Sequence, residues 1–139
     1  MDTGLIPNEE QIAEYELMKY KNAYKYLVLA LNGSQTSIDI VAKGDPEASH
    51  EDLIKELPEN DARVIVTDFF YETQEDVPRK INKLILINWM PSKTPIKRRF
   101  ATSSSIGGIK SKFVGIQKDI QASDTAEISY ESIFEQMPK

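Results

Sequence analysis

Two short apolar segments, residues 62–70 and 84–89, constrain the fold more than any other feature of the sequence. Both are rich in valine, isoleucine, leucine and aromatic residues, a composition that favours β-strands. Strands that are apolar on both faces lie in the centre of a sheet, with other elements packed on either side of it. The two segments therefore predict an α/β domain in which they form central strands.

The rest of the chain predicts helices and further strands from the spacing of its apolar residues. One helix begins at Asn8 with two glutamates in its first turn, and another begins at Ser49, whose hydroxyl can accept from the amide of Asp52. We expect helices over 8–19, 49–57, 95–105, 109–113 and 129–137, and strands over 24–31, 37–43, 62–70, 84–89 and 115–121. This order predicts a mixed sheet between helical layers.

Glycine, proline and acidic residues set the expected boundaries of these elements. Asn32-Gly33 predicts a hairpin between the first two strands, because both residues tolerate positive φ. The acidic segment 72–76 is the expected turn between the two central strands. Pro95 suits the first position of the helix that follows it. Gly107-Gly108 lowers helix propensity by about 1 kcal/mol per glycine relative to alanine, so we expect a break or kink before Ile109.

Length and composition limit the classes of protein that the chain can belong to. The 139 residues, 40% of them hydrophobic, fit one domain over 1–139 with a flexible N-terminal extension over 1–7. There is no cysteine and one histidine, His50, which excludes a thiol nucleophile and a Cys or His zinc cluster. The longest apolar stretch, Tyr26 to Leu31, is far below the roughly 18 residues of a membrane helix. We expect a soluble, cytoplasmic, monomeric protein without a cofactor or a metal.

No set of side chains in the sequence predicts catalysis. Ser49, His50 and Asp52 are neighbours at an expected exposed helix start, where a cap is far more common than a catalytic triad. Asp68 lies in an expected core strand, where it suits a structural hydrogen-bond acceptor as readily as an acid. Gly107-Gly108 lacks the spacing of a phosphate-binding loop. We therefore expect a binding protein and not an enzyme.

The charges are divided unevenly along the chain. The net charge is −5, yet residues 79–118 hold ten basic residues and no acidic one. The other 99 residues carry seven basic and 22 acidic residues. This division predicts a basic surface on an acidic body, suited to an acidic protein, a phosphate group or an anionic lipid, unless it is only a solvated helix face. Nucleic acid is not expected, because the acidic remainder would repel its phosphate backbone.

Two segments are candidates for a binding surface. On a helix that begins at Pro95, Ile96 and Phe100 share one face, with Lys97 and Arg99 on either side of it. Helical spacing alone places Phe100 in the core. The other segment is the N-terminal extension, whose small and apolar residues stay in water unless the domain or a partner covers them: Thr3, Gly4, Leu5 and Ile6.

The segment from Leu57 to Tyr71, Leu-Pro-Glu-Asn-Asp-Ala-Arg-Val-Ile-Val-Thr-Asp-Phe-Phe-Tyr, resembles a signature of the actin-depolymerising factor/cofilin family. The resemblance continues, in order and with few gaps, at Trp89-x-Pro91, Thr94 to Arg99, Thr102 to Ser105, Val114 to Gln117 and Ile120 to Ser129. It implies a single ADF-homology (gelsolin-like) domain, with a mixed central sheet of about five strands flanked by helices on both faces.

The resemblance also implies an actin-binding function. Members of this family bind actin monomers and filaments, sever filaments and promote filament depolymerisation. Their monomer-binding surface combines the N-terminal extension with the helix after Pro95, and the residue that matches Phe100 faces actin and not the core. The matching positions are Thr3, Gly4, Leu5, Ile6, Lys97, Arg99, Phe100, Ser104 and Ile106.

Several positions depart from the family pattern. A second family surface, used only on filaments, corresponds here to Lys80, Lys83 and Glu135. Ile81 and Gln136 stand where relatives often carry basic residues, so we expect filament binding and severing to be weakened while monomer binding persists. Ile106 replaces a lysine of relatives, and Gly107-Gly108 replaces an Asp-Ala pair, which is expected to loosen the end of the helix.

The sequence leaves regulation and two alternative functions open. Thr3-Gly4 matches a Ser-Gly pair that is phosphorylated in the family, and a phosphate of about −2 charge there would oppose docking on an acidic partner. An unmodified tail residue is the alternative reading of Thr3. The alternative functions are the binding of phosphoinositides or another anionic surface by the basic residues, and action on a different complex, as in glia maturation factor.

Overall fold

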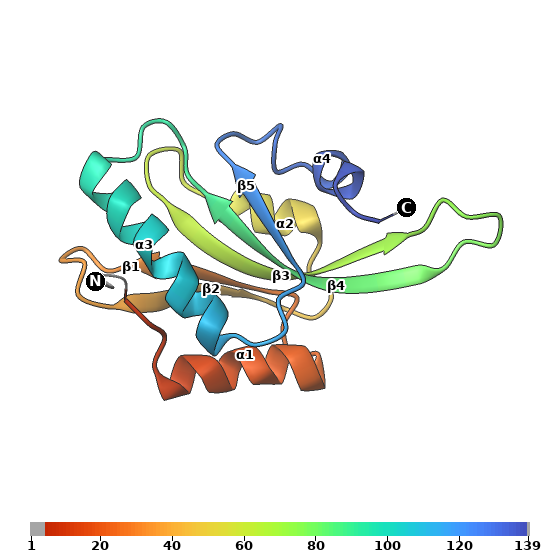
Figure 1. Cartoon of the computed structure of the whole chain (residues 1–139), viewed down its shortest axis with the longest axis horizontal. Helices are drawn as coiled ribbons and strands as arrows, with labels where there is room; N and C mark the ends of the chain where they lie inside the picture. The colour runs from red at the N-terminus through yellow and green to blue at the C-terminus, as the bar shows by residue number, and fades with distance from the viewer. Residues whose placement is uncertain (1–4, 139) are drawn as a thin grey trace.

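Residues 5–138, the part of the chain described by the computed structural model, form one mixed five-stranded sheet with helices on both faces (Figure 1). In chain order the elements are α1 (Glu9–Lys21), β1 (Tyr26–Leu31), β2 (Ile38–Gly44), α2 (His50–Lys55), β3 (Arg63–Glu72), β4 (Lys80–Trp89), α3 (Ile96–Lys112), β5 (Lys118–Ala122) and α4 (Tyr130–Glu135). The strands lie in the order β2-β1-β3-β4-β5, antiparallel except for the parallel pair β4 and β5. The predicted α/β fold with a mixed sheet is confirmed.

Each face of the sheet carries its own hydrophobic cluster beneath two helices. Helices α1 and α3 cover one face, where Met18 and Ile109 pack with Leu86 of β4. Helices α2 and α4 cover the other face, where Leu53 and Ile133 pack on the same strands. Successive strand residues point to opposite faces of the sheet. A strand that contributes side chains to both clusters must therefore be apolar at successive positions. This explains why the two central strands could be recognised from their composition.

The starts of the first two helices lie where they were predicted, and both carry a reciprocal side-chain cap. The Asn8 side chain accepts a hydrogen bond from the amide of Gln11 at 2.9 Å, and the Gln11 side chain accepts one from the amide of Asn8 at 2.9 Å. The same reciprocal pair forms at α2, where Ser49 Oγ accepts from the amide of Asp52 at 3.1 Å. These contacts satisfy backbone donors that the first helical turn leaves unpaired.

Helix α3 runs unbroken through Gly107 and Gly108, so the predicted break before Ile109 is wrong. One helix therefore replaces the two that were expected, and it begins at Ile96, so Pro95 occupies the position before the first helical residue and not the first helical position predicted for it. Each glycine lowers helix propensity by about 1 kcal/mol, but tertiary packing supplies most helical stability in proteins. Ser105 and Ile109, on either side of the glycines, are buried and hold the helix on the sheet.

The hairpin of β1 and β2 forms where it was predicted, but not through the predicted turn. The connection runs from Asn32 to Ser37, and a positive φ of 58° belongs to Gln35, not to Asn32 or Gly33. Asn32 instead organises the turn with its side chain. Its Oδ1 accepts hydrogen bonds from the amides of Thr36 at 2.8 Å and Ser37 at 3.2 Å.

The hairpin of β3 and β4 is longer than predicted and projects beyond the helices (Figure 1). The two strands pair without interruption from Arg63 opposite Trp89 to Glu72 opposite Lys80. The acidic segment therefore begins inside the ladder, and the connection is residues 73–79. No helix within residues 5–138 is long and apolar enough to cross a membrane.

Candidate interaction surface

Helix α3 presents large apolar side chains to solvent. Phe100 is 74% exposed and Ile96 is 72% exposed. The helix packs on the sheet through its opposite face, which includes the small polar side chains of Thr102 and Ser105 as well as Ile109. Helical spacing alone was therefore wrong about Phe100, because it took the larger apolar residues of the first turns for the buried face. The resemblance to the family had placed this side chain on the surface.

Lys97 and Arg99 flank Phe100 on opposite sides of the helix, since successive residues turn by about 100° around the axis. Lys97 is exposed and has no ion-pair partner among the described residues. Arg99 is half-buried, and its guanidinium donates to the carbonyls of Pro91 at 3.4 Å and Ser92 at 3.3 Å. An exposed apolar centre is thus bordered by one free cation and one partly held cation.

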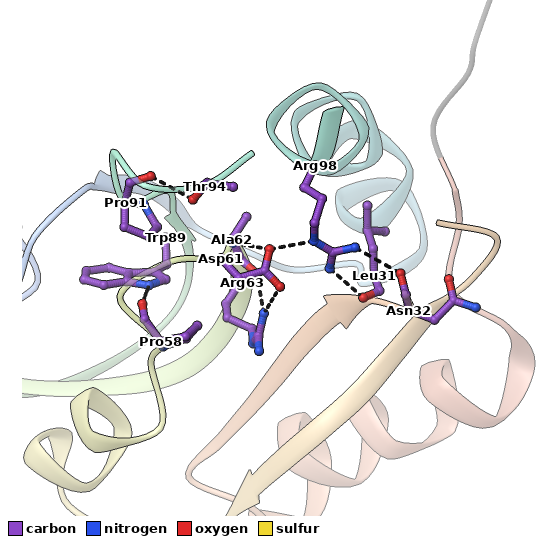
Figure 2. A network of polar contacts seen from close by, with 10 residues as sticks. All are labelled: Leu31, Asn32, Pro58, Asp61, Ala62, Arg63, Trp89, Pro91, Thr94 and Arg98. Carbon is purple, nitrogen blue, oxygen red and sulfur yellow. Dashed lines mark hydrogen bonds and ion pairs between the residues drawn. The ribbon is translucent and has the colours of Figure 1, made fainter. Parts of the chain in front are cut away.

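Arg98, between them, points toward the sheet and has a structural role (Figure 2). Its Nε donates to Asp61 Oδ1 at 2.6 Å, and its other nitrogens donate to the carbonyls of Leu31 at 2.8 Å and Asn32 at 3.0 Å. The second oxygen of Asp61 accepts from Arg63 at 2.9 Å. This separation could not be predicted from the sequence, because three consecutive cations read as one basic cluster and their partners are distant in the chain.

The charge on Asp61 is stabilised by this network. Burial alone would raise the pKa of its carboxyl, but hydrogen bonds from Arg98 and Arg63 and from the backbone amide of Ala62 bring the pKa below the usual value. The carboxylate therefore stays ionised at neutral pH and anchors the first turn of α3.

Residues 5–7, here called the arm, lie along α3. The amide of Leu5 donates to Ser105 Oγ at 3.1 Å, and the Leu5 side chain packs against the cluster beneath α1 and α3. Pro7 is buried, whereas Ile6 is 54% exposed. We expected a flexible extension over residues 1–7, but its last three residues pack on the domain. Thr3 and Gly4 lie outside the described residues.

Two further predicted residues lie on α3 in different settings. Ser104 is exposed, and its hydroxyl donates to the carbonyl of Phe100 at 2.8 Å. Ile106 is half-buried and packs against the cluster beneath α1 and α3, so part of its side chain belongs to the core. The structure thus brings Leu5, Ile6, Lys97, Arg99, Phe100 and Ser104 to one helix and its neighbouring arm.

The three residues predicted for a second surface are not all brought together. Lys80 and Lys83 are three positions apart on β4, so they lie on opposite faces of the sheet. Lys83 shares its face with the half-buried Ile81, which packs on the cluster beneath α2 and α4. Glu135 is an exposed residue of α4 and lies on that same side. Lys80 faces the other way.

The basic segment is partly neutralised by its own carboxylate partners. Three of its ten cations form ion pairs within residues 5–138: Arg79 with Glu75 at 2.9 Å, Arg98 with Asp61 at 2.6 Å and Lys110 with Asp119 at 2.7 Å. The others are spread over β4, the loop that follows it, α3 and the start of β5. This spread gives less support to an anionic-surface binder than to a local site on α3.

Ser49 and Asp52 lie at an exposed helix start as expected, but His50, the first residue of α2, is buried. It is 8% exposed, and one ring nitrogen lies 2.6 Å from the carbonyl oxygen of Ile128. Its ring packs edge-on against Phe69 and Tyr130. Among the described residues no group of three His, Cys, Asp or Glu side chains is arranged to hold a metal ion.

The chain is similar to known proteins over nearly its whole length. The family described as cofilin/tropomyosin-type actin-binding protein matches residues 4–137. Actophorin from Acanthamoeba castellanii is 34% identical over 137 residues, which are 99% of this chain and 97% of the relative. Cofilin from Schizosaccharomyces pombe is 31% identical over 137 residues, with the same coverage of 99% and 97%. Actin-depolymerizing factor 3 from Zea mays is 30% identical over 131 residues, or 94% of this chain and 93% of the relative.

Solved structures give the same result for the fold. Cofilin from Streptomyces griseoflavus superposes with a TM-score of 0.83 at 26% identity, covering 96% of each chain. Actin depolymerization factor 2 from Plasmodium berghei superposes with a TM-score of 0.81 over 98% of this chain and 97% of the other, and at 22% identity it supports the fold alone. The family match over residues 4–137, together with the identity to relatives over nearly their whole length, shows that this chain belongs to the cofilin/tropomyosin-type family of actin-binding proteins.

Proposed function

We propose that this protein binds actin monomers through the exposed face of α3 and the arm, and that it promotes filament depolymerisation and turnover. The observation that carries the proposal is the 74% exposure of Phe100 on a helix whose opposite face is packed on the sheet. An aromatic side chain beside the equally exposed Ile96, bordered by cations, is a typical anchor for a protein partner. Because the chain belongs to a family of actin-binding proteins, we expect that partner to be actin. We expect the protein to act on actin filaments in the cytoplasm.

The proposed mechanism is binding, with no bond made or broken. Burial of Phe100 in the partner supplies most of the affinity, because a few central aromatic residues dominate protein interfaces. Lys97 sits beside this anchor without an ion pair of its own, so it can attract an acidic partner and raise the association rate. A fixed helix adds to the affinity because it loses little conformational entropy on binding.

Titration of labelled monomeric actin with Phe100→Ala tests the proposal. Loss of a central anchor typically costs about 2 kcal/mol, so the affinity should fall by roughly 30-fold. Tyr20→Ala is the matched control, because Tyr20 is a 66% exposed aromatic residue of α1 that lies near Lys112, at the end of α3 farthest from Phe100. Fluorescence of the single tryptophan, Trp89, checks that both variants fold. Equal affinity of the Phe100 and Tyr20 variants would remove α3 from the site.

We also propose that this protein binds filaments more weakly than monomers. Its severing of filaments should be weakened for the same reason. Lys83 and Glu135 lie on one side of the sheet, but Lys80 faces the other side and Ile81 is half-buried and uncharged. The exposed Gln136 beside Glu135 offers a gain-of-function test, because Gln136→Lys adds a cation there. Co-sedimentation with filaments should improve in this variant. Wild-type affinity for filaments as high as for monomers would contradict the proposal.

A further inference from the structure

The second glycine of the Gly107-Gly108 pair lies in contact with the arm. A Cβ atom built on Gly108 would lie 2.6 Å from Ile6 Cγ2 and 3.0 Å from the carbonyl oxygen of Leu5. The first separation is shorter than the contacts that real Cβ atoms make, and the second, to a backbone atom, is tighter than most of them. Any residue larger than glycine at this position must therefore move the Ile6 side chain and shift the backbone of the arm away from the helix.

A separate contact holds the arm in the same place. Ser105 Oγ, in a residue that is only 1% exposed, accepts the amide hydrogen of Leu5 at 3.1 Å while donating its own hydrogen to the carbonyl of Ala101 at 2.7 Å. The hydroxyl is thus oriented so that its lone pairs are available to the arm. At the other end, Pro7 is buried and leads directly into Asn8, the cap of α1. The arm is fixed at both ends.

The position of the arm brings Ile6 next to the exposed face of α3. Gly108 and Lys97 are eleven residues apart, which is about three helical turns, so they lie on the same flank of the helix. Ser104 lies one turn before Gly108 on that flank. The 54% exposed side chain of Ile6 therefore lies on the flank of α3 that carries Lys97, about two turns beyond Phe100.

We propose that Gly108 is a positioning residue, which lets the arm dock on α3 before the partner arrives, so that arm and helix bind actin as one preformed surface. The inference rests on the proposed function and deepens it. A docked arm has already lost the backbone freedom that a free one would lose on binding. The glycine pair lowers helix propensity, but the absence of a side chain at Gly108 lets the arm approach the helix closely.

A pair of alanine variants of the full chain tests this inference. Gly107→Ala and Gly108→Ala raise helix propensity equally, but a Cβ on Gly107 meets no atom within 4 Å. Gly107→Ala should keep the wild-type exchange rate of the Leu5 amide and the wild-type affinity for monomeric actin within about twofold. Gly108→Ala should expose the Leu5 amide to faster hydrogen exchange and weaken the affinity by about 5- to 30-fold, as expected if the backbone of one residue must be ordered again.

A second variant keeps the test decisive if Gly108→Ala folds poorly by Trp89 fluorescence. Ser105→Ala removes the acceptor of the Leu5 amide without steric conflict, and it should produce the same faster exchange with a smaller loss of affinity. The inference would be overturned if Gly108→Ala and Ser105→Ala both bound actin with wild-type affinity. It would also be overturned if the Leu5 amide exchanged as slowly in both variants as in the wild type. If the wild-type chain binds no actin, the proposed function fails and the role toward actin fails with it, whereas Leu5 exchange still shows whether Gly108 places the arm.

Discussion

Arg98 Nε and Asp61 Oδ1 lie 2.6 Å apart, and this ion pair joins the first turn of α3 to the segment that leads into β3. The same guanidinium donates to the carbonyls of Leu31 and Asn32, where β1 ends. One side chain therefore fixes α3 relative to two strands (Figure 2). Its neighbours Lys97 and Arg99 owe their outward direction to it, because the helix cannot rotate while the pair is intact.

Asp61→Asn should destabilise the fold in a pH-dependent way. Because the folded-state pKa of Asp61 is lowered, its carboxylate contributes stability that is fully present above the unfolded pKa and is lost as the pH falls through the folded pKa. The variant should lose about 2 kcal/mol at pH 7, typical of a hydrogen-bonded charged partner. The difference from wild type should shrink below the usual Asp pKa of about 3.9.

Urea unfolding at pH 7 and in acid, followed by the fluorescence of Trp89, measures this difference. Glu75→Gln is the control, because Glu75 pairs with Arg79 in the exposed hairpin, where screening by water leaves little net stabilisation. A gap between Asp61→Asn and wild type that stays constant with pH would show that the ion pair is not its source.

Gly44→Ala should destabilise the edge of the sheet. A Cβ on Gly44 would meet the ring of Tyr26, with Cδ2 and Cζ at 2.6 Å, and that ring is only 4% exposed and cannot swing away. Overpacking of this kind typically costs about 1–3 kcal/mol. Gly33→Ala is the matched control, since a Cβ there meets nothing within 4 Å. Thermal unfolding of the two variants compares them, and equal midpoints would contradict the argument.

His50→Ala should be among the most destabilising single changes in α2. The variant loses ring contacts with Phe69 and Tyr130 and leaves the carbonyl of Ile128 without its partner at 2.6 Å. The combined loss of packing and a buried hydrogen bond should cost about 2–4 kcal/mol in the free energy of unfolding. Lys55→Ala, an exposed change in the same helix, should cost less than about 0.5 kcal/mol. A similarly small cost for His50→Ala would mean that the ring is not held as described.

Patterns within one segment predicted most of the fold. The composition of β3 and β4, the cap Ser49, and the acidic first turn and apolar spacing of α1 are local properties, and each identified its element within a few residues. The glycine pair of α3 led to the wrong prediction of a helix break. Its effect on helix propensity is small compared with the stabilisation from the packing of Ser105 and Ile109.

The site could be predicted only in part, because its geometry depends on contacts between distant segments. Phe100 looked buried by periodicity, and only the resemblance to a family placed it outside. Neither pattern nor resemblance distinguished Arg98 from its neighbours, since its partner Asp61 is 37 positions away. The contact of Leu5 with Ser105 spans 100 positions and left no trace in either segment.

Lys97→Ala should slow association with actin monomers while leaving dissociation and folding stability nearly unchanged. Lys97 is exposed and forms no ion pair or hydrogen bond among the described residues, so its removal disturbs nothing within the domain. A rim charge of this kind acts mainly on the encounter rate, and salt screens it over about 10 Å at 0.1 M ionic strength. Stopped-flow association at low ionic strength should therefore be a few-fold slower than wild type, and the difference should fade as salt is added. Lys112→Ala, which removes an exposed cation from the far end of α3, should associate at nearly the wild-type rate. A loss that appears in the dissociation rate and does not depend on salt would mean that Lys97 makes a buried contact in the complex instead of steering it.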